Sequence, residues 1–95
     1  MKEMTAAEVK ETLPVKHIID VREVDEVAEG KIPGAIHIPL GLLEFRMQEL
    51  DKNIEYTLVC RSGGRSGRAA QLLESHGYKV VNMAGGMLAW DGPVE

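Results

Sequence analysis

Short apolar, β-branched runs alternate with amphipathic segments along this chain, and the alternation constrains the fold more than any other feature. The runs at residues 17–21, 56–60 and 79–83 have the composition of buried strands, and a shorter strand is expected between Pro33 and Pro39. Strands that are separated by helices pair in parallel through right-handed crossovers. The sequence therefore predicts an α/β fold with helices on both faces of a parallel sheet.

Helical segments fill the intervals between the predicted strands. The start of the chain is polar and helix-like, and Thr5 with Glu8 forms a capping-box pattern for a helix that stops before Pro14. Apolar residues at 43, 47 and 50 would share one face of a later helix. The predicted helices span residues 5–12, 23–28, 40–50 and 66–76, and a last short helix follows Gly85 and Gly86.

Length, charge and cysteine content bound the possible functions. The chain has 95 residues, so residues 1–95 are expected to form a single domain. The formal net charge of -4 argues against nucleic acid or an anionic membrane as the main partner. No apolar stretch approaches the roughly 20 residues of a membrane-spanning helix, and the start lacks the apolar region of a signal peptide, so a cytoplasmic location is expected. The one cysteine, Cys60, has no internal partner for a disulfide.

The loop between the strand at 56–60 and the helix at 66–76 has the composition of an anion site around a thiol. Helix starts offer unpaired N–H groups and the positive end of the helix dipole. Its two glycines allow positive φ, so that successive N–H groups can converge, and its two arginines and Arg68 add positive charge. Such surroundings lower the pKa of a cysteine thiol below about 8.5. The loop residues are Cys60, Arg61, Ser62, Gly63, Gly64, Arg65 and Ser66.

A simpler interpretation of Cys60 is a core residue without chemistry, which is the usual role of a lone cysteine at the end of a buried strand. The following loop favours the chemical interpretation, because a core cysteine needs no anion cradle around it. The three histidines at positions 17, 37 and 76 lack the spacing of a metal site, so no metal is expected.

Four segments, in order along nearly the whole chain, resemble the rhodanese, or thiosulfate sulfurtransferase, family in its small single-domain form. Residues 18–23 are similar to the family's Asp-x-Arg segment. Residues 30–39 are similar to its Gly-His-Ile-Pro-Gly-Ala segment, with Lys31 at the usual histidine position. Residues 60–65 match its six-residue active-site loop, and residues 84–90 match its closing Gly-Gly-x-x-x-Trp segment.

This resemblance implies a rhodanese-like fold: a five-stranded, mostly parallel sheet flanked by helices on both faces. It implies that Cys60 is the catalytic, persulfide-forming residue and that Asp20 ties loops together through hydrogen bonds. The expected activity is that of a thiosulfate sulfurtransferase without a cofactor. Its partners would be a small sulfur-donor anion and a thiol or cyanide acceptor, with a protein cysteine as a further candidate for either role. The expected substrate-binding residues are Arg61, Ser62, Gly63, Gly64, Arg65 and Ser66.

Two other functions remain open at this point. Related folds carry cysteine phosphatases and arsenate reductases, whose loops run from cysteine to arginine through five residues. Here four residues separate Cys60 from Arg65, which leaves the loop one residue short for a tetrahedral phosphate. The other alternative is a catalytically silent rhodanese-like module that binds proteins, and the presence of Cys60 speaks against it.

Overall fold

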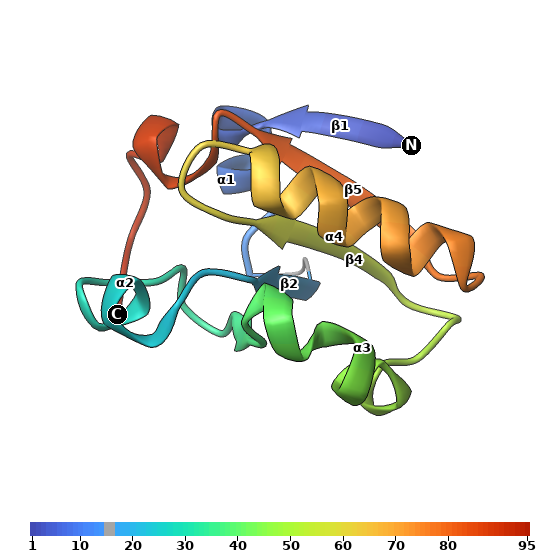
Figure 1. Cartoon of the computed structure of the whole chain (residues 1–95). Helices are drawn as coiled ribbons and strands as arrows, with labels where there is room; N and C mark the ends of the chain where they lie inside the picture. Colours follow the sequence, from blue (N-terminus) through green and yellow to red (C-terminus); the bar gives the residue numbers. More distant parts are fainter. Residues whose placement is uncertain (15–16) are drawn as a thin grey trace.

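The computed structural model describes residues 1–14 and 17–95, and these residues contain a five-stranded sheet in the order β1-β5-β4-β2-β3 (Figure 1). Every neighbouring pair of strands in it is parallel. The strands are β1 (Lys2–Thr5), β2 (His17–Asp20), β3 (Ile36–His37), β4 (Glu55–Val59) and β5 (Lys79–Ala84). The predicted α/β class and the parallel sheet are confirmed.

Helices connect the strands and cover the sheet (Figure 1). The α-helices are α1 (Ala6–Glu11), α2 (Val24–Ala28), α3 (Leu43–Arg46) and α4 (Gly64–Ser75). Short 3₁₀ helices are η1 (Leu40–Leu42), η2 (Met47–Glu49) and η3 (Gly86–Ala89). The predicted capping box begins α1: the Thr5 hydroxyl accepts from the Glu8 N–H at 3.1 Å, and the Glu8 carboxylate accepts from the Thr5 N–H at 2.8 Å.

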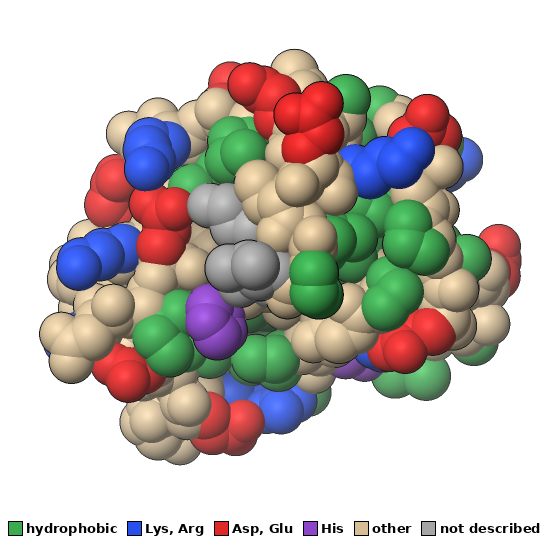
Figure 2. Space-filling view, turned by 180° about the vertical axis from the view of Figure 1, so that it is seen from behind, with side chains coloured by type: hydrophobic (Ala, Val, Ile, Leu, Met, Phe, Trp, Pro, Cys, Tyr) green, Lys and Arg blue, Asp and Glu red, His purple; other side chains and the backbone are tan. Residues whose placement is uncertain are grey.

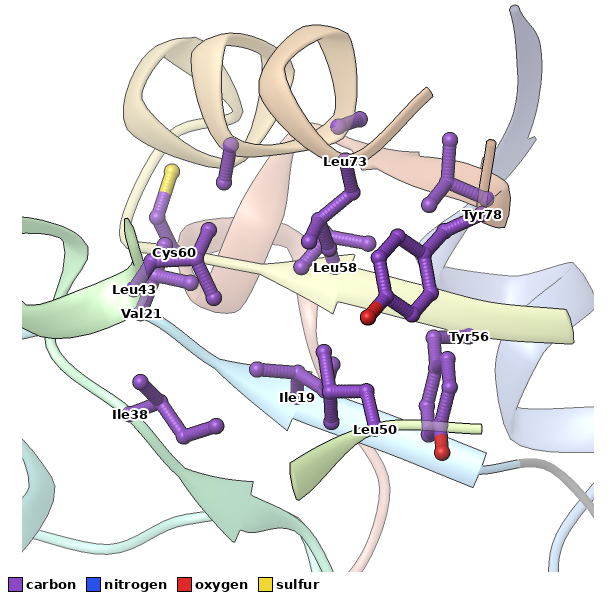
Figure 3. Close-up of a cluster of buried hydrophobic side chains, with 13 residues drawn as sticks. Ile19, Val21, Ile38, Leu43, Leu50, Tyr56, Leu58, Cys60, Leu73 and Tyr78 are labelled. Atoms are coloured by element: carbon purple, nitrogen blue, oxygen red, sulfur yellow. The ribbon is translucent and has the colours of Figure 1, made fainter. Parts of the chain in front are cut away.

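Two hydrophobic clusters pack the two faces of the sheet. Because side chains alternate along a strand, β4 sends Tyr56 and Leu58 to one face and Val59 to the other. The first cluster continues with residues of α3 and α4, and Figure 3 shows it with Cys60 at one end and the sulfur pointing toward α4. The second cluster packs against α1, with Met87 and Trp90 at its margin. The thiol therefore belongs to the face that α4 covers.

The first strand is a correction to the sequence prediction, which took the chain start as helix-like. Residues Lys2–Thr5 instead pair in parallel with β5, from Lys2 beside Val81 to Thr5 beside Ala84. A polar edge strand lacks the apolar alternation of a half-buried strand, and its pairing partner lies far along the sequence. Three of its four residues are exposed, so their polar character gave no strand signal.

The segment at 40–50 is a second correction, because it is not one continuous helix. It divides into η1, α3 and η2, although Leu43 and Leu50 face the core as the periodicity predicted. The Met47 carbonyl accepts both the Tyr78 hydroxyl at 2.7 Å and the Leu50 N–H at 3.0 Å, which closes a 3₁₀ turn there. Tertiary hydrogen bonds thus override the local helical pattern.

No helix within residues 1–14 and 17–95 combines the length and the apolar character needed to cross a membrane. The far side of the molecule, seen in Figure 2, shows charged side chains of both signs spread between apolar ones.

Candidate functional site

Cys60 lies directly after β4, at the edge of the sheet where parallel strands end. Val59, the last residue of β4, pairs with Asp20, the last residue of β2. The chain then turns away from the sheet and enters α4, so that the loop from Cys60 to Ser66 sits above the ends of the central strands. Only 1% of Cys60 is exposed, which means that the thiol lies beneath the loop.

The loop bends back over the sulfur because Gly63 has a φ of +105°, a left-handed conformation that glycine adopts without strain. This turn points the Gly63 N–H at Cys60 Sγ over 3.0 Å. It also starts α4 at Gly64, two residues before the predicted start at Ser66, which places the first turn of the helix inside the loop. The Ser66 N–H of that turn is one of the backbone donors to the thiol.

Hydrogen bonds to the sulfur favour its ionised form. Burial raises the pKa of the Cys60 thiol, but the Ser66 hydroxyl and the N–H groups of Ser66, Gly63 and Ser62 outweigh it, so the pKa lies below its ordinary value. The Ser66 hydroxyl lies 3.3 Å from Sγ and is fully buried. The predicted activation of the thiol thus has a source in the loop amides and in one serine.

The short helix η3 supports the beginning of the loop through two backbone hydrogen bonds. The Met87 N–H donates to the Cys60 carbonyl at 2.9 Å, and the Leu88 N–H donates to the Arg61 carbonyl at 3.0 Å. Gly86 makes this approach possible, since a Cβ there would lie 2.4 Å from the Arg61 carbonyl oxygen. The sequence marked the Gly85-Gly86 pair as a helix start and as part of a Gly-Gly-x-x-x-Trp segment, but its role in supporting the loop was missed.

A pocket of about 350 Å³ opens beside the loop. Arg61 is exposed on its wall, and within the described residues its side chain makes no hydrogen bond or ion pair. The other lining residues are Arg22, Glu26, Glu29, Met87 and Leu88. Arg61 is therefore free to meet an anion that enters this pocket.

Arg65, the other loop arginine, is held by Glu26 of α2. Its two terminal nitrogens donate to the two carboxylate oxygens, each at 2.7 Å, in the paired geometry that suits a guanidinium and a carboxylate. This contact lowers the pKa of Glu26 to about 2, with further help from the Glu23 N–H. The sequence gave no sign of Glu26, because its partner lies 39 positions away.

Replacing Glu26 with glutamine tests this pair through its pH dependence. A carboxylate whose pKa falls from 4.5 to about 2 on folding stabilises the fold above pH 4.5, and this stabilisation is lost as the pH falls toward 2. We expect Glu26→Gln to lower the free energy of unfolding by about 1 kcal/mol at pH 7, since the pair is half-buried. Urea unfolding at several pH values should show this difference shrink below pH 4.5 and vanish only near pH 2.

Arg65→Met removes the same pair from the other side and serves as the matched variant. Combined with Glu26→Gln it should cost little beyond either single change, because both remove one interaction. A difference that stays constant down to about pH 2.5 would show that the ionised Glu26 carboxylate is not its source.

A buried ion pair between Asp20 and Arg22 lies next to the pocket, and Arg22 lines it. Arg22 donates to both carboxylate oxygens of Asp20, at 2.8 to 3.1 Å, and to the Gly30 carbonyl at 2.8 Å. The His37 ring nitrogen lies 2.7 Å from the Arg22 carbonyl oxygen. Arg22, which Asp20 holds in place, thus ties the segment after β2 to the turn after α2. Over residues 1–14 and 17–95, no three His, Cys, Asp or Glu side chains are placed to hold a metal ion.

Comparisons with known proteins agree with this fold. The model of the Rhodanese-like domain family matches residues 5–92, a range that includes the whole loop. The chain is 46% identical to the putative sulfurtransferase YtwF of Bacillus subtilis, covering 97% of this chain and 92% of that protein. It is 37% identical to the thiosulfate sulfurtransferase PspE of Escherichia coli, covering 80% of this chain and 78% of that one. The crystal structure of a rhodanese-like domain protein from Staphylococcus aureus superposes with a TM-score of 0.95 at 37% identity, over 100% of this chain and 97% of the other.

Proposed function

This chain belongs to the rhodanese-like domain family, and we propose that it is a sulfurtransferase that carries sulfane sulfur as a persulfide on Cys60. The observation that carries the proposal is the set of hydrogen-bond donors around one sulfur, which lowers the pKa of the Cys60 thiol despite its burial. A thiolate is the nucleophilic form of cysteine. The names of YtwF and PspE support the same class of reaction.

In the first step the Cys60 thiolate attacks the outer sulfur of thiosulfate or a similar anion. A sulfur–sulfur bond forms on Cys60, the bond between the two sulfurs of thiosulfate breaks, and sulfite leaves with the electron pair. The negative charge of the enzyme moves from Sγ to the new terminal sulfur, where the N–H groups of Ser62, Gly63 and Ser66 would stabilise it. Arg61, on the pocket wall, would bind the anionic part of the donor.

In the second step an outside nucleophile removes the terminal sulfur and restores the thiolate. Cyanide would leave as thiocyanate, whereas a cellular thiol or a protein cysteine would leave as a persulfide. An external acceptor is required because Cys60 is the one cysteine of the sequence. This gives a two-step, ping-pong scheme that needs no cofactor.

The proposal is tested by the mass of the intact protein after exposure to thiosulfate and removal of small molecules. The protein should gain one sulfur atom and lose it again when cyanide or a reducing thiol is added. Cys60→Ser is the matched control, since it keeps the size of the side chain and lacks the thiol, and it should gain nothing. A serine variant that still gains sulfur, or a wild type that gains none, would overturn the assignment.

An assay for phosphate hydrolysis on the same preparation distinguishes the proposed function from the two alternatives. Hydrolysis of an aryl phosphate should be negligible, because the loop has four residues between Cys60 and Arg65 and because Glu26 already occupies the Arg65 guanidinium. Phosphate release faster than sulfur transfer would instead identify a phosphatase. A protein that neither loads sulfur nor cleaves the phosphate would be a binding module.

A further inference from the structure

The Ser66 hydroxyl has two acceptors and one hydrogen. Its oxygen lies 3.3 Å from Cys60 Sγ and 2.6 Å from Oδ1 of Asn82 on β5. All three side chains are buried, so solvent does not supply a second donor to either acceptor. At any moment the hydroxyl can satisfy the sulfur or the amide, and not both.

The orientation of the Asn82 amide is fixed by its nitrogen. Nδ2 lies 3.3 Å from the Gly63 carbonyl oxygen and 3.4 Å from a carboxylate oxygen of Glu3 on β1. Both neighbours are acceptors, which requires the NH₂ group on that side and leaves Oδ1 facing Ser66. Since Oδ1 can only accept, the hydrogen between it and Ser66 belongs to the serine.

We propose that Asn82 is a positioning residue for the sulfur chemistry, which takes the Ser66 hydrogen bond when Sγ is uncharged and gives it up when Sγ is a thiolate. This inference extends the proposed function, because its second consequence concerns the persulfide. In the thiol form, S–H donates to the Ser66 oxygen and the Ser66 hydroxyl donates to Asn82. When the thiol proton leaves to solvent, the hydroxyl rotates to the thiolate and Asn82 Oδ1 loses its donor.

Sulfur loading reverses this rotation. When thiosulfate transfers its outer sulfur and sulfite departs, the charge moves to the terminal sulfur and Sγ becomes a neutral, weak acceptor. The Ser66 hydroxyl then returns to Asn82. Asn82 is therefore satisfied in the thiol and in the persulfide but not in the free thiolate. It raises the free energy of the empty, ionised site relative to the loaded one and so helps the protein to hold sulfur.

Charged groups from several elements also surround the thiol, and the substitutions of Ser66 and Asn82 leave these groups in place. Arg61 and Arg65 lie on the loop and α4, and Glu26 reaches the site from α2. Asp20 and Arg22 form an ion pair at the end of β2. Glu3 on β1 touches Asn82 itself. Of these groups, only Glu3 loses a hydrogen bond when the Asn82 side chain is replaced.

The test compares the pH dependence of Cys60 alkylation in Ser66→Ala and Asn82→Leu. Loss of the serine hydroxyl removes a donor to the thiolate, so the midpoint pH of alkylation should rise by about 0.5 to 1 pH unit. Loss of the asparagine leaves the serine with one acceptor, so the midpoint should fall by a similar amount. The equilibrium constant for sulfur loading should fall about three- to tenfold in Asn82→Leu. It is obtained from the ratio of loaded to empty protein at a fixed ratio of thiosulfate to sulfite. If Ser66 and Asn82 only supported the loop, both substitutions would raise the midpoint pH of alkylation.

Two further variants complete the design. In the Ser66→Ala background, Asn82→Leu should have no effect on the midpoint, because the hydroxyl that links the two residues is gone. Glu3→Gln should leave the midpoint unchanged. If Asn82→Leu does not fold, Asn82→Asp replaces it: a buried carboxylate beside Ser66 keeps the hydroxyl away from the sulfur, and the midpoint should rise.

Each measurement has an outcome that would overturn the inference about Asn82. An Asn82→Leu midpoint that is unchanged or raised would overturn the inference, as would an unchanged midpoint in Asn82→Asp where that variant is used. The alkylation arm does not require sulfur transfer. A wild type that takes up no sulfur from thiosulfate would therefore contradict the proposed function, while the shift in midpoint would still report on Asn82 and Ser66.

Discussion

Gly86→Ala is expected to destabilise the protein by about 2–4 kcal/mol and to displace the loop from Cys60 to Ser66. Gly86 has a φ of +57°, and a Cβ there would lie 2.4 Å from the Arg61 carbonyl oxygen and 2.6 Å from that of Cys60. Both contacts are with backbone, so relief requires η3 and the loop to separate. That separation would stretch the hydrogen bonds from Met87 and Leu88 to the same two carbonyls.

Gly34→Ala is the matched control for the backbone strain. Gly34 also has a positive φ, +80°, but nothing lies within 4 Å of the position its Cβ would take. The control therefore carries the conformational cost, about 1–2 kcal/mol, without the collision. Thermal unfolding measures both variants, and alkylation of Cys60 reports the loop. Gly86→Ala should lower the melting temperature further than Gly34→Ala and raise the pH midpoint of alkylation. Equal losses in the two variants would show that the close approach at Gly86 is easily relaxed.

The sequence predicted the parts of the site that lie close together along the chain. The loop from Cys60 to Ser66 is local, and its glycines, arginines and following helix have known effects on a thiol. The strands β2, β4 and β5 were predicted because buried parallel strands are apolar throughout. The alternation of strands and helices then sufficed for the α/β class.

Contacts across the fold were beyond such reasoning. Asn82 and Glu26 reach the loop from 16 and 39 positions away, and nothing in their local sequence marks them. Strand β1 was taken for helix because its exposed polar residues resemble a helix start, whereas its pairing with β5 is set by the tertiary fold. The difference between the paired Arg65 and the exposed Arg61 likewise depends on where α2 places the Glu26 carboxylate.

Arg61→Ala is expected to reduce sulfur transfer from thiosulfate by about 10- to 100-fold in kcat/KM, mainly through a higher KM. Arg61 is exposed on the pocket wall, and no described side chain competes for its guanidinium. Removal of one charged donor in a closed site has a larger effect, but this pocket is open to water, which screens the charge. Arg61→Lys should recover part of the loss, because it keeps the charge and loses the paired geometry.

Arg65→Ala is the comparison that decides which arginine meets the donor. Both Arg65 nitrogens are engaged by Glu26 at 2.7 Å, so its removal should change kcat/KM by less than about threefold while lowering stability. The transfer rate of the wild type should also fall as salt is added, and this dependence should weaken in Arg61→Ala more than in Arg65→Ala. If Arg65→Ala proves the more damaging of the two, the guanidinium leaves Glu26 when the anion binds. The ion pair between α2 and α4 would then be a resting contact that the substrate breaks.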